Sequence, residues 1–213
     1  MANINIRQIT KSNNKTKLIE FNDKMQFNDF SEETGVIKSS THNKFSRIQL
    51  TIVDWTEGKK EKAIVVSHNI TPSNLKLVAE MVLRNNTAVF EQIDKYTKKA
   101  GYLEQKINFR KKNERGCSPV TFLNIRYQSN MNSPWTITIE NGEGIPQISS
   151  IGGVTIKAGS YQKIASATVF LSTTEFVSKM IEVKDYIQSF ETSHFLKMLH
   201  LRAEKEKEKA EIN

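Results

Sequence analysis

The chain has 213 residues, which is enough for one large domain or two small packed domains with a core that needs no disulfide or metal to hold it. A hydrophobic fraction of 38% and a charged fraction of 25% exclude an extensively disordered chain. The formal net charge of +8 favours an anionic partner, such as nucleic acid, an acidic membrane surface or an acidic protein, although a basic surface can also be passive.

The single cysteine, Cys117, cannot form an internal disulfide bond, so the fold does not require an oxidising compartment. The N-terminal residues contain no apolar run typical of a signal peptide, and no segment approaches the ~18 consecutive apolar residues of a membrane span. We therefore expect a cytoplasmic protein with no membrane partner.

Residues 1–16 are predicted to be an N-terminal tail, and residues 17–104 a first half made of strands and helices. In this half, Leu18–Phe21 and Phe45–Trp55 have the alternation of half-buried strands, and Lys62–His68 returns after a turn. Thr71 and Pro72 are typical of a helix N-cap and first position. A second helix is expected over residues 87–99.

Residues 105–201 are predicted to repeat this plan as a second half. Lys106–Phe109 matches the first strand, and Val120–Tyr127 and Trp135–Glu140 match the hairpin, so that Gln49 corresponds to Asn124 and Thr51 to Arg126. An insertion follows, in which residues 168–171 add a strand. Ser172 and Glu175 form a capping box, which begins a helix that is followed by a second helix over residues 193–209. Residues 202–213 are expected to be a charged helix end or tail.

These elements predict an α+β fold with two pseudo-symmetric halves, each an antiparallel sheet followed and covered by helices. Gene duplication would produce this pattern, and so would the general frequency of strand–turn–strand–helix units. The alternation assigns Ile48, Leu50, Ile52, Leu123 and Ile125 to the core, and Trp135 to the same side as Ile137 and Ile139.

The opposite faces of the same strands carry polar and aromatic residues that suit single-stranded nucleic acid. Rings stack on unpaired bases, cations follow phosphates and amides contact base edges. On the sheets and beside them, the candidate binding residues are Lys44, Phe45, Arg47, Gln49, Trp55, Phe122, Asn124 and Arg126. Such aromatic residues are also often covered by a loop or another subunit.

Two basic loops and a glycine-containing segment are the second group of candidates, because cations in loops hold phosphates. They contribute Lys59, Lys60 and Lys62 at a hairpin tip, Arg110, Lys111, Lys112 and Arg115 before a strand, and Lys157 and Lys163 in the insertion. The alternative is that these groups are solvated connectors; we slightly favour binding.

The motifs of catalysis and metal binding are missing from the sequence. None of the four histidines lies four residues from another, as in a helical zinc pair, and there is no nucleophile elbow or phosphate-binding loop. We expect no enzyme, no cofactor and no metal site, although acidic residues distant in sequence can still meet in a fold.

The paired hairpins (residues 45–68 and 120–140) and the helix entries Ile70–Leu75 and Leu171–Phe176 resemble the Whirly and positive-cofactor-4-like group of single-stranded DNA-binding proteins. The resemblance implies sequence-tolerant binding across exposed sheets, without cofactor or chemistry, and makes a homo-oligomer unsurprising. The predicted function is binding of single-stranded nucleic acid, with DNA favoured over RNA. The alternative is an assembly module that docks a partner through its sheets or through Phe195, Leu196, Met198, Leu199 and Leu201 of the C-terminal helix.

Overall fold

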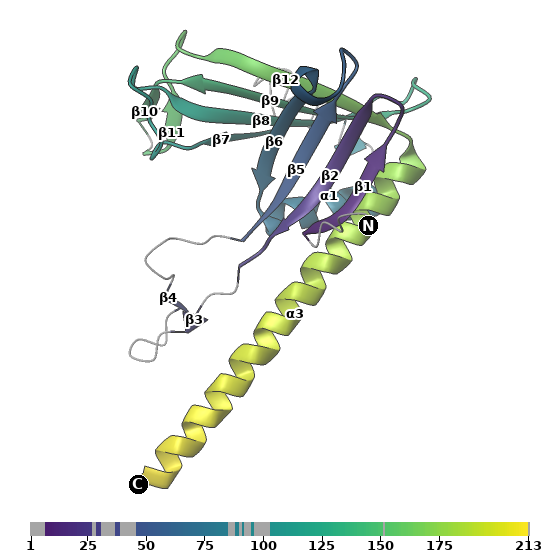
Figure 1. Ribbon diagram of the computed structural model, residues 1–213. Helices are drawn as coiled ribbons and strands as arrows, with labels where there is room; N and C mark the ends of the chain where they lie inside the picture. Colours follow the sequence, from purple (N-terminus) through teal and green to yellow (C-terminus); the bar gives the residue numbers. More distant parts are fainter. Residues whose placement is uncertain are drawn as a thin grey trace.

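The computed structural model describes residues 7–26, 29–30, 37–38, 46–84, 88–89, 91, 95, 103–150 and 152–212. The predicted positions Lys44 and Phe45 and most of the expected helix over residues 87–99 lie outside these ranges. The fold is α+β, as predicted; its described residues include two four-stranded antiparallel sheets, two short hairpins, a 12-residue helix and a 40-residue helix (Figure 1).

The first sheet has the strand order β1-β2-β5-β6. Its strands are β1 (Gln8–Asn13), β2 (Lys17–Lys24), β5 (Arg47–Asp54) and β6 (Ile64–Ile70). The short hairpin β3 (Asp29–Phe30) and β4 (Ile37–Lys38) lies between β2 and β5 in sequence, and the 3-10 turn η1 (Lys60–Lys62) precedes β6. Helix α1 (Pro72–Leu83) follows β6 directly.

The second sheet has the order β7-β8-β9-β12, again with consecutive strands side by side. Its strands are β7 (Glu104–Ile107), β8 (Ser118–Tyr127), β9 (Trp135–Gly144) and β12 (Gln162–Leu171). The hairpin β10 (Pro146–Ile148) and β11 (Val154–Ile156) is inserted between β9 and β12, and helix α3 (Thr173–Ile212) follows β12 directly.

Each half is therefore a four-stranded meander followed by a helix, and the correspondence predicted from the sequence is wrong by one strand. By topology β8 matches β2, β9 matches β5 and β12 matches β6, so Gln49 corresponds to a residue of β9 rather than to Asn124. Two strands caused the error. The first, β1, lies inside the predicted tail, and its polar sequence QITKSN hides a strand whose Thr10 is buried. The second, β12, begins at Gln162, six residues before the expected strand.

The helix starts are as predicted. The Thr71 hydroxyl accepts a hydrogen bond from the Asn74 amide at 3.2 Å, with Pro72 next to it at the first helical position. The Ser172 amide donates to Glu175 Oε2 at 2.9 Å and the Glu175 amide donates to Ser172 Oγ at 3.2 Å, which completes the capping box. The two C-terminal helices expected separately form one helix, because no glycine or proline interrupts residues 173–212.

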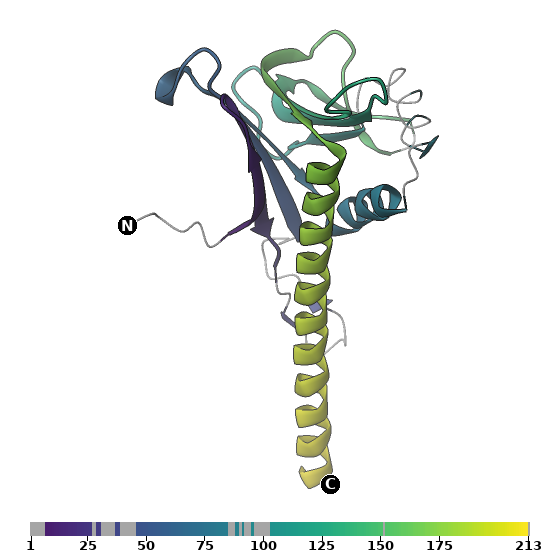
Figure 2. The ribbon, with the colours of Figure 1, turned by 90° about the vertical axis from the view of Figure 1, so that its right-hand side faces the viewer.

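One hydrophobic core joins both sheets and both helices. Ile48, Leu50 and Ile52 of β5 are buried in it, as are Leu123, Ile125 and Trp135, as the alternation predicts. Helix α1 contacts β5, helix α3 contacts β1, and the two helices contact each other on the same side of the first sheet (Figure 2). Phe176 of α3 packs on Trp135 with ring centroids 4.3 Å apart, which connects the long helix to the second sheet.

Strand β6 lies across the inner face of the second sheet and contacts β8, β9 and β12. The Asn141 amide, oriented to match its partners, donates to the Ser67 carbonyl at 3.1 Å and accepts from the Ser67 amide at 3.3 Å. Buried His68 hydrogen-bonds Thr121 Oγ1 through Nδ1 at 2.8 Å. The backbone of an edge strand and the Nδ1 atom of a buried imidazole thus both find hydrogen-bond partners across the seam between the sheets.

Candidate nucleic-acid interface

The outer face of each sheet is the set of strand residues that point away from the shared core. In the second sheet, Phe122, Asn124 and Arg126 share this face, as predicted, and they pair with Glu140, Thr138 and Thr136 of β9. All six are half-buried. The face is therefore polar with one ring at its centre.

Phe122 is held in a side-chain contact. The Tyr161 ring meets it edge-on at a centroid distance of 5.1 Å, and the Tyr161 hydroxyl donates to Glu140 at 2.7 Å. Burial, and next the contact with Glu140, raises the pKa of the Tyr161 hydroxyl. Tyr161 comes this close because residue 142 is glycine: a Cβ there would lie 2.6 Å from the tyrosine ring. The Phe122 ring consequently shares its surroundings with Tyr161 and is not an isolated stacking platform.

Trp55 is half-buried at the end of β5 and connects two turns. Its indole Nε1–H donates to the Lys15 carbonyl at 2.9 Å, and its amide donates to the Thr16 carbonyl at 2.9 Å. These bonds give Trp55 a part in holding the β1–β2 turn against β5.

The β5–β6 turn presents Lys59, Lys60 and Lys62, which are all exposed. Lys15, from the neighbouring β1–β2 turn, is exposed at the same end of the sheet, because antiparallel neighbours turn at shared ends. Glu57 and Glu61 are also exposed in this region, so the cluster has mixed charge.

The β7–β8 loop holds Arg110, Lys111 and Lys112 in exposed positions. Asn113 organises this loop: its Oδ1 accepts the amides of Arg115 at 3.0 Å and Cys117 at 2.9 Å. Arg115, a predicted phosphate contact, is paired with Glu143 of β9. Of the four predicted cations in this loop, Arg115 is therefore the one with a structural partner on the sheet.

The structure brings the β7–β8 loop and the β9–β12 insertion to the same end of the second sheet. Lys157 is exposed in the insertion, and the exposed Lys163 lies 3.4 Å from Glu140. The predicted cations of the second half, which are up to 53 residues apart in the sequence, thus lie at one end of one sheet.

The outer face of the first sheet contains a row of carboxamides that the sequence did not reveal. Cross-strand pairing connects Gln8 to Asn22, Asn22 to Gln49, and Gln49 to Asn69, so the row crosses all four strands. Gln49 was a predicted site residue. The alternation in β2 and β6 was the signal available for Asn22 and Asn69, whereas Gln8 lies on the strand that was mistaken for a tail.

Beside this row, three cations lie close together. Lys24 is directly opposite Arg47 in the β2–β5 register, and Arg47 also donates to the Ser46 carbonyl at 2.8 Å. Burial, and next the charge of Arg7, lowers the pKa of Lys24. Lys24 and Arg47 thus place two positive charges opposite each other at this edge of the row.

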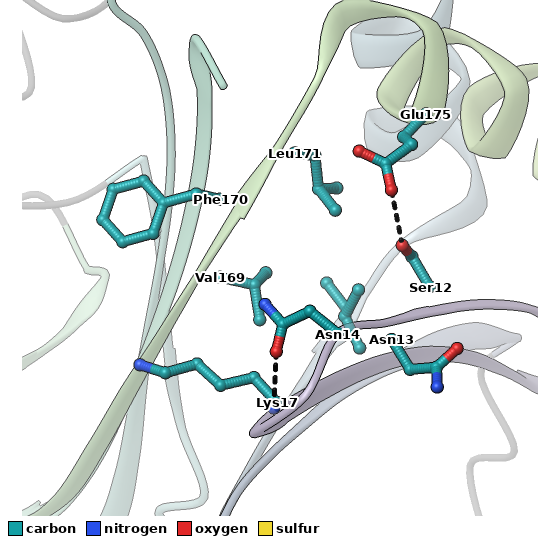
Figure 3. A pocket seen from close by; sticks show the side chains of 9 residues that line it. Ser12, Asn13, Asn14, Lys17, Val169, Phe170, Leu171 and Glu175 are labelled. Carbon is teal, nitrogen blue, oxygen red and sulfur yellow. Dashed lines mark hydrogen bonds between the residues drawn. The ribbon is translucent and has the colours of Figure 1, made fainter. Parts of the chain in front are cut away.

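A small cleft lies where the β1–β2 turn meets β12 (Figure 3). Lys17 Nζ donates to the Thr168 carbonyl at 3.0 Å and pairs with Asp54 at 2.8 Å, and Ser12 Oγ donates to Glu175 at 3.4 Å. The cleft has a volume of about 30 Å³, which is room for two waters at roughly 10–15 Å³ each. The Lys17 contacts that line the cleft connect the two sheets, and the cleft is too small for a nucleotide.

Within the described part of the chain, no three histidine, cysteine, aspartate or glutamate side chains are grouped to hold a metal ion. Among the same residues, no helix combines the length and apolar character of a membrane span.

No protein-family model matches the chain, and no curated protein matches it. Among solved structures, the chain is similar to one described as the plant transcriptional regulator PBF-2. The superposition has a TM-score of 0.39 and 11% sequence identity, and covers 86% of this chain and 84% of the other. The function proposed below rests on the residues of this chain alone.

Proposed function

We propose that this protein binds single-stranded nucleic acid, DNA in preference to RNA, in a sequence-tolerant way and without catalysis. Binding would use the outer face of the first sheet together with the basic loops. The single cysteine suits action in a reducing compartment such as the cytoplasm.

The observation that carries this proposal is the outer face of the first sheet, where the four-carboxamide row lies beside Arg7, Lys24 and Arg47. Amide groups donate hydrogen bonds to base edges and accept hydrogen bonds from them, and adjacent cations pair with phosphates. The face points away from both helices (Figure 2), so an extended strand can lie along it.

A single strand fits this face better than a duplex does. Carboxamides on a broad sheet reach base edges only when the bases are unpaired, because a sheet of four strands does not enter a groove of B-DNA. Gln8, Gln49 and Asn69 make no side-chain hydrogen bond with other residues in the described ranges, so their amide groups are available to a ligand.

The first test is fluorescence anisotropy with labelled single-stranded DNA, duplex DNA and RNA of equal length, at about 50 and 200 mM salt. The proposal predicts tightest binding to single-stranded DNA, with an affinity that falls with salt. No binding of any of these nucleic acids at the lower salt concentration would overturn it.

The double variant Lys24→Gln/Arg47→Gln then tests the face itself. Loss of two phosphate contacts lowers the slope of log K against log salt by about 1.4, at roughly 0.7 per contact on a single strand. Thermal unfolding of the double variant separates a binding effect from a folding effect. The matched control is Lys95→Gln/Lys207→Gln, which removes the same charge at two exposed helical positions. An equal change in slope in both double variants would mean that net charge, and not this face, determines binding.

A second candidate is a protein-interaction module, and α3 favours it. Beyond the sheets the helix projects away from the body (Figure 1) and exposes Phe195, Leu196 and Leu199. An apolar helix face of this kind docks into grooves or on other helices. Sedimentation velocity at high salt tests it: a rise in mass with concentration that Leu196→Asp abolishes would support association through α3.

A further inference from the structure

A shallow hollow lies at the end of the second sheet between the β7–β8 loop and the β10–β11 hairpin. It is lined by Phe109, Lys112, Pro146, Gln147, Ile148 and Val154 and has a volume of about 220 Å³. Ile148 and Val154 are directly opposite each other in the β10–β11 register, so their side chains form one wall. Phe109, which follows β7 in the loop, supplies an aromatic ring.

The lining is more apolar than a solvated loop requires. Phe109 is 50% exposed, Ile148 79% and Val154 37%, so three large apolar side chains meet water around one concavity. Isolated exposed apolar residues are ordinary, but a group that contains an aromatic ring marks a place where something docks.

The charges around the hollow indicate the chemistry of the occupant. Lys112 is the one charged residue of the lining, and the neighbouring Arg110 and Lys111 are exposed in the same loop. An anionic ligand with a flat apolar part would satisfy both the cations and the ring. Gln147 adds one amide group that can contact the edge of such a ligand.

The volume of the hollow limits the size of the ligand that it can hold. Pockets for drug-sized molecules measure roughly 300–1,000 Å³, so a hollow of about 220 Å³ suits a smaller flat group. A nucleobase is flat, stacks on aromatic rings irrespective of sequence and carries a phosphate on either side.

We infer that this hollow binds one nucleobase of a single-stranded nucleic acid, stacked on Phe109, while Arg110, Lys111 and Lys112 hold the adjacent phosphates. The inference rests on the proposed function and adds to it a base-binding subsite outside the sheet faces. If the inference is right, this end of the second sheet contacts bases as well as phosphates.

The test compares two ligands of equal length and charge: an oligothymidylate and an oligomer of abasic sites with the same backbone. The wild-type protein is expected to bind the oligothymidylate more tightly. Phe109→Ala should weaken binding of the oligothymidylate by at least about fivefold, which is the lower end of the effect of losing one stacked base. Its affinity for the abasic oligomer should stay within about twofold of wild type.

Two variants make the result specific. Phe109→Trp keeps a stacking ring and should retain wild-type affinity for the oligothymidylate. Phe195→Ala removes a ring that is 61% exposed on α3, outside the lining of the hollow, and should change neither affinity. Because Phe109 is half exposed, thermal unfolding of Phe109→Ala should match wild type, which excludes a folding defect.

The outcomes separate this inference from the proposed function. If Phe109→Ala weakens both ligands equally, the ring supports the loop and holds no base, and the inference fails. If Phe109→Ala changes nothing while Lys24→Gln/Arg47→Gln weakens binding, the proposed function stands and the hollow is left to another occupant, such as an apolar side chain of a protein. If the wild-type protein binds neither ligand, both the function and the subsite are wrong.

Discussion

The two four-stranded sheets have the same strand order and each is followed at once by a helix, yet their solvent surfaces differ in kind. The first sheet presents polar residues fixed on strands, with the carboxamide row from Gln8 to Asn69. The second presents its cations and its apolar hollow on a loop and an inserted hairpin. The features of the first surface lie on paired strands, whereas those of the second lie on the connections between strands.

The difference indicates which parts of a repeated topology can vary and which cannot. Packing constrains the strands, because both inner faces belong to a single core. The connections are free to change, since they cover the surface and tolerate insertion. We therefore expect substitutions in the core to affect both halves together and substitutions on the surfaces to affect them separately.

The largest effect should come from the core. Phe176→Ala removes the ring that packs on Trp135 and should lower the free energy of unfolding by about 3–5 kcal/mol, while Leu75→Ala in α1 should cost about 2–5 kcal/mol. Because both residues belong to the core that both sheets share, each variant should unfold in one transition, with coincident tryptophan fluorescence and circular dichroism in urea. Two separate transitions would show that the halves are independent.

The seam between the sheets should rank next. Thr121→Val leaves the buried His68 Nδ1 without its partner at 2.8 Å, and should cost about 1–3 kcal/mol in urea denaturation. The matched control is Thr51→Val, which makes the same change on the outer face of the first sheet and should stay within about 0.5 kcal/mol of wild type. Equal costs at the two positions would remove His68 and Thr121 from the role of joining the sheets.

Charge reversal compares the basic loops of the two halves. The triple variant Arg110→Glu, Lys111→Glu and Lys112→Glu should weaken binding to all sequences alike and lower the salt slope by about 2, for three lost contacts. The corresponding triple variant at Lys59, Lys60 and Lys62 should have a smaller effect, because Glu57 and Glu61 already reduce the net positive charge of that turn. Anisotropy titrations over a range of salt measure both slopes. Unchanged binding in the first variant would exclude the β7–β8 loop from the interface.

The helix caps should give the smallest effects. Thr71→Ala and Ser172→Ala each remove a side-chain acceptor at a helix start and should cost about 1 kcal/mol in thermal or urea unfolding. A larger cost at Ser172 would reflect a second lost bond, in which the Ser172 hydroxyl donates to Glu175 Oε2 at 2.8 Å.

Glu175 adds a pH dependence to this comparison. Hydrogen bonds from Ser172 lower its pKa below the ordinary value of 4.5, so its contribution to stability is present above that pH and is lost as pH falls through the lowered value. Glu175→Gln should therefore be less stable than wild type at pH 7, and this difference should shrink at about pH 3. A difference in stability that is constant with pH would mean that the charge of Glu175 does not matter.

The sequence predicted what depends on local periodicity and local hydrogen bonding. Alternation placed Ile48, Leu50 and Ile52 inside, and the Ser172–Glu175 pair marked a helix start, because both patterns repeat within a few residues. It failed at β1, whose six residues include one large apolar side chain, Ile9, so that no alternating apolar face marks the strand. That omission shifted the whole correspondence between the halves.

The sequence proposed some residues of the candidate site, such as Gln49, Arg47 and the loop cations, but not how they assemble. Arg110 and Lys157 meet at one end of a sheet only because the strands between them are antiparallel neighbours. Arg115 was expected to be a phosphate contact, and its pairing with Glu143 depends on a loop conformation set by Asn113. The hollow beside Phe109 requires the hairpin register that places Ile148 next to Val154, which a single sequence does not specify.

The length of α3 has a consequence for how the molecule moves in solution. Its 40 residues extend about 60 Å, and the C-terminal part of the helix projects beyond the two sheets (Figure 1). Such a particle reorients quickly about the helix axis and slowly across it, so its rotational diffusion is unequal in different directions. Backbone amides of the helix, which lie parallel to that axis, should relax in nuclear magnetic resonance as if they belonged to a heavier protein than the amides of the two sheets.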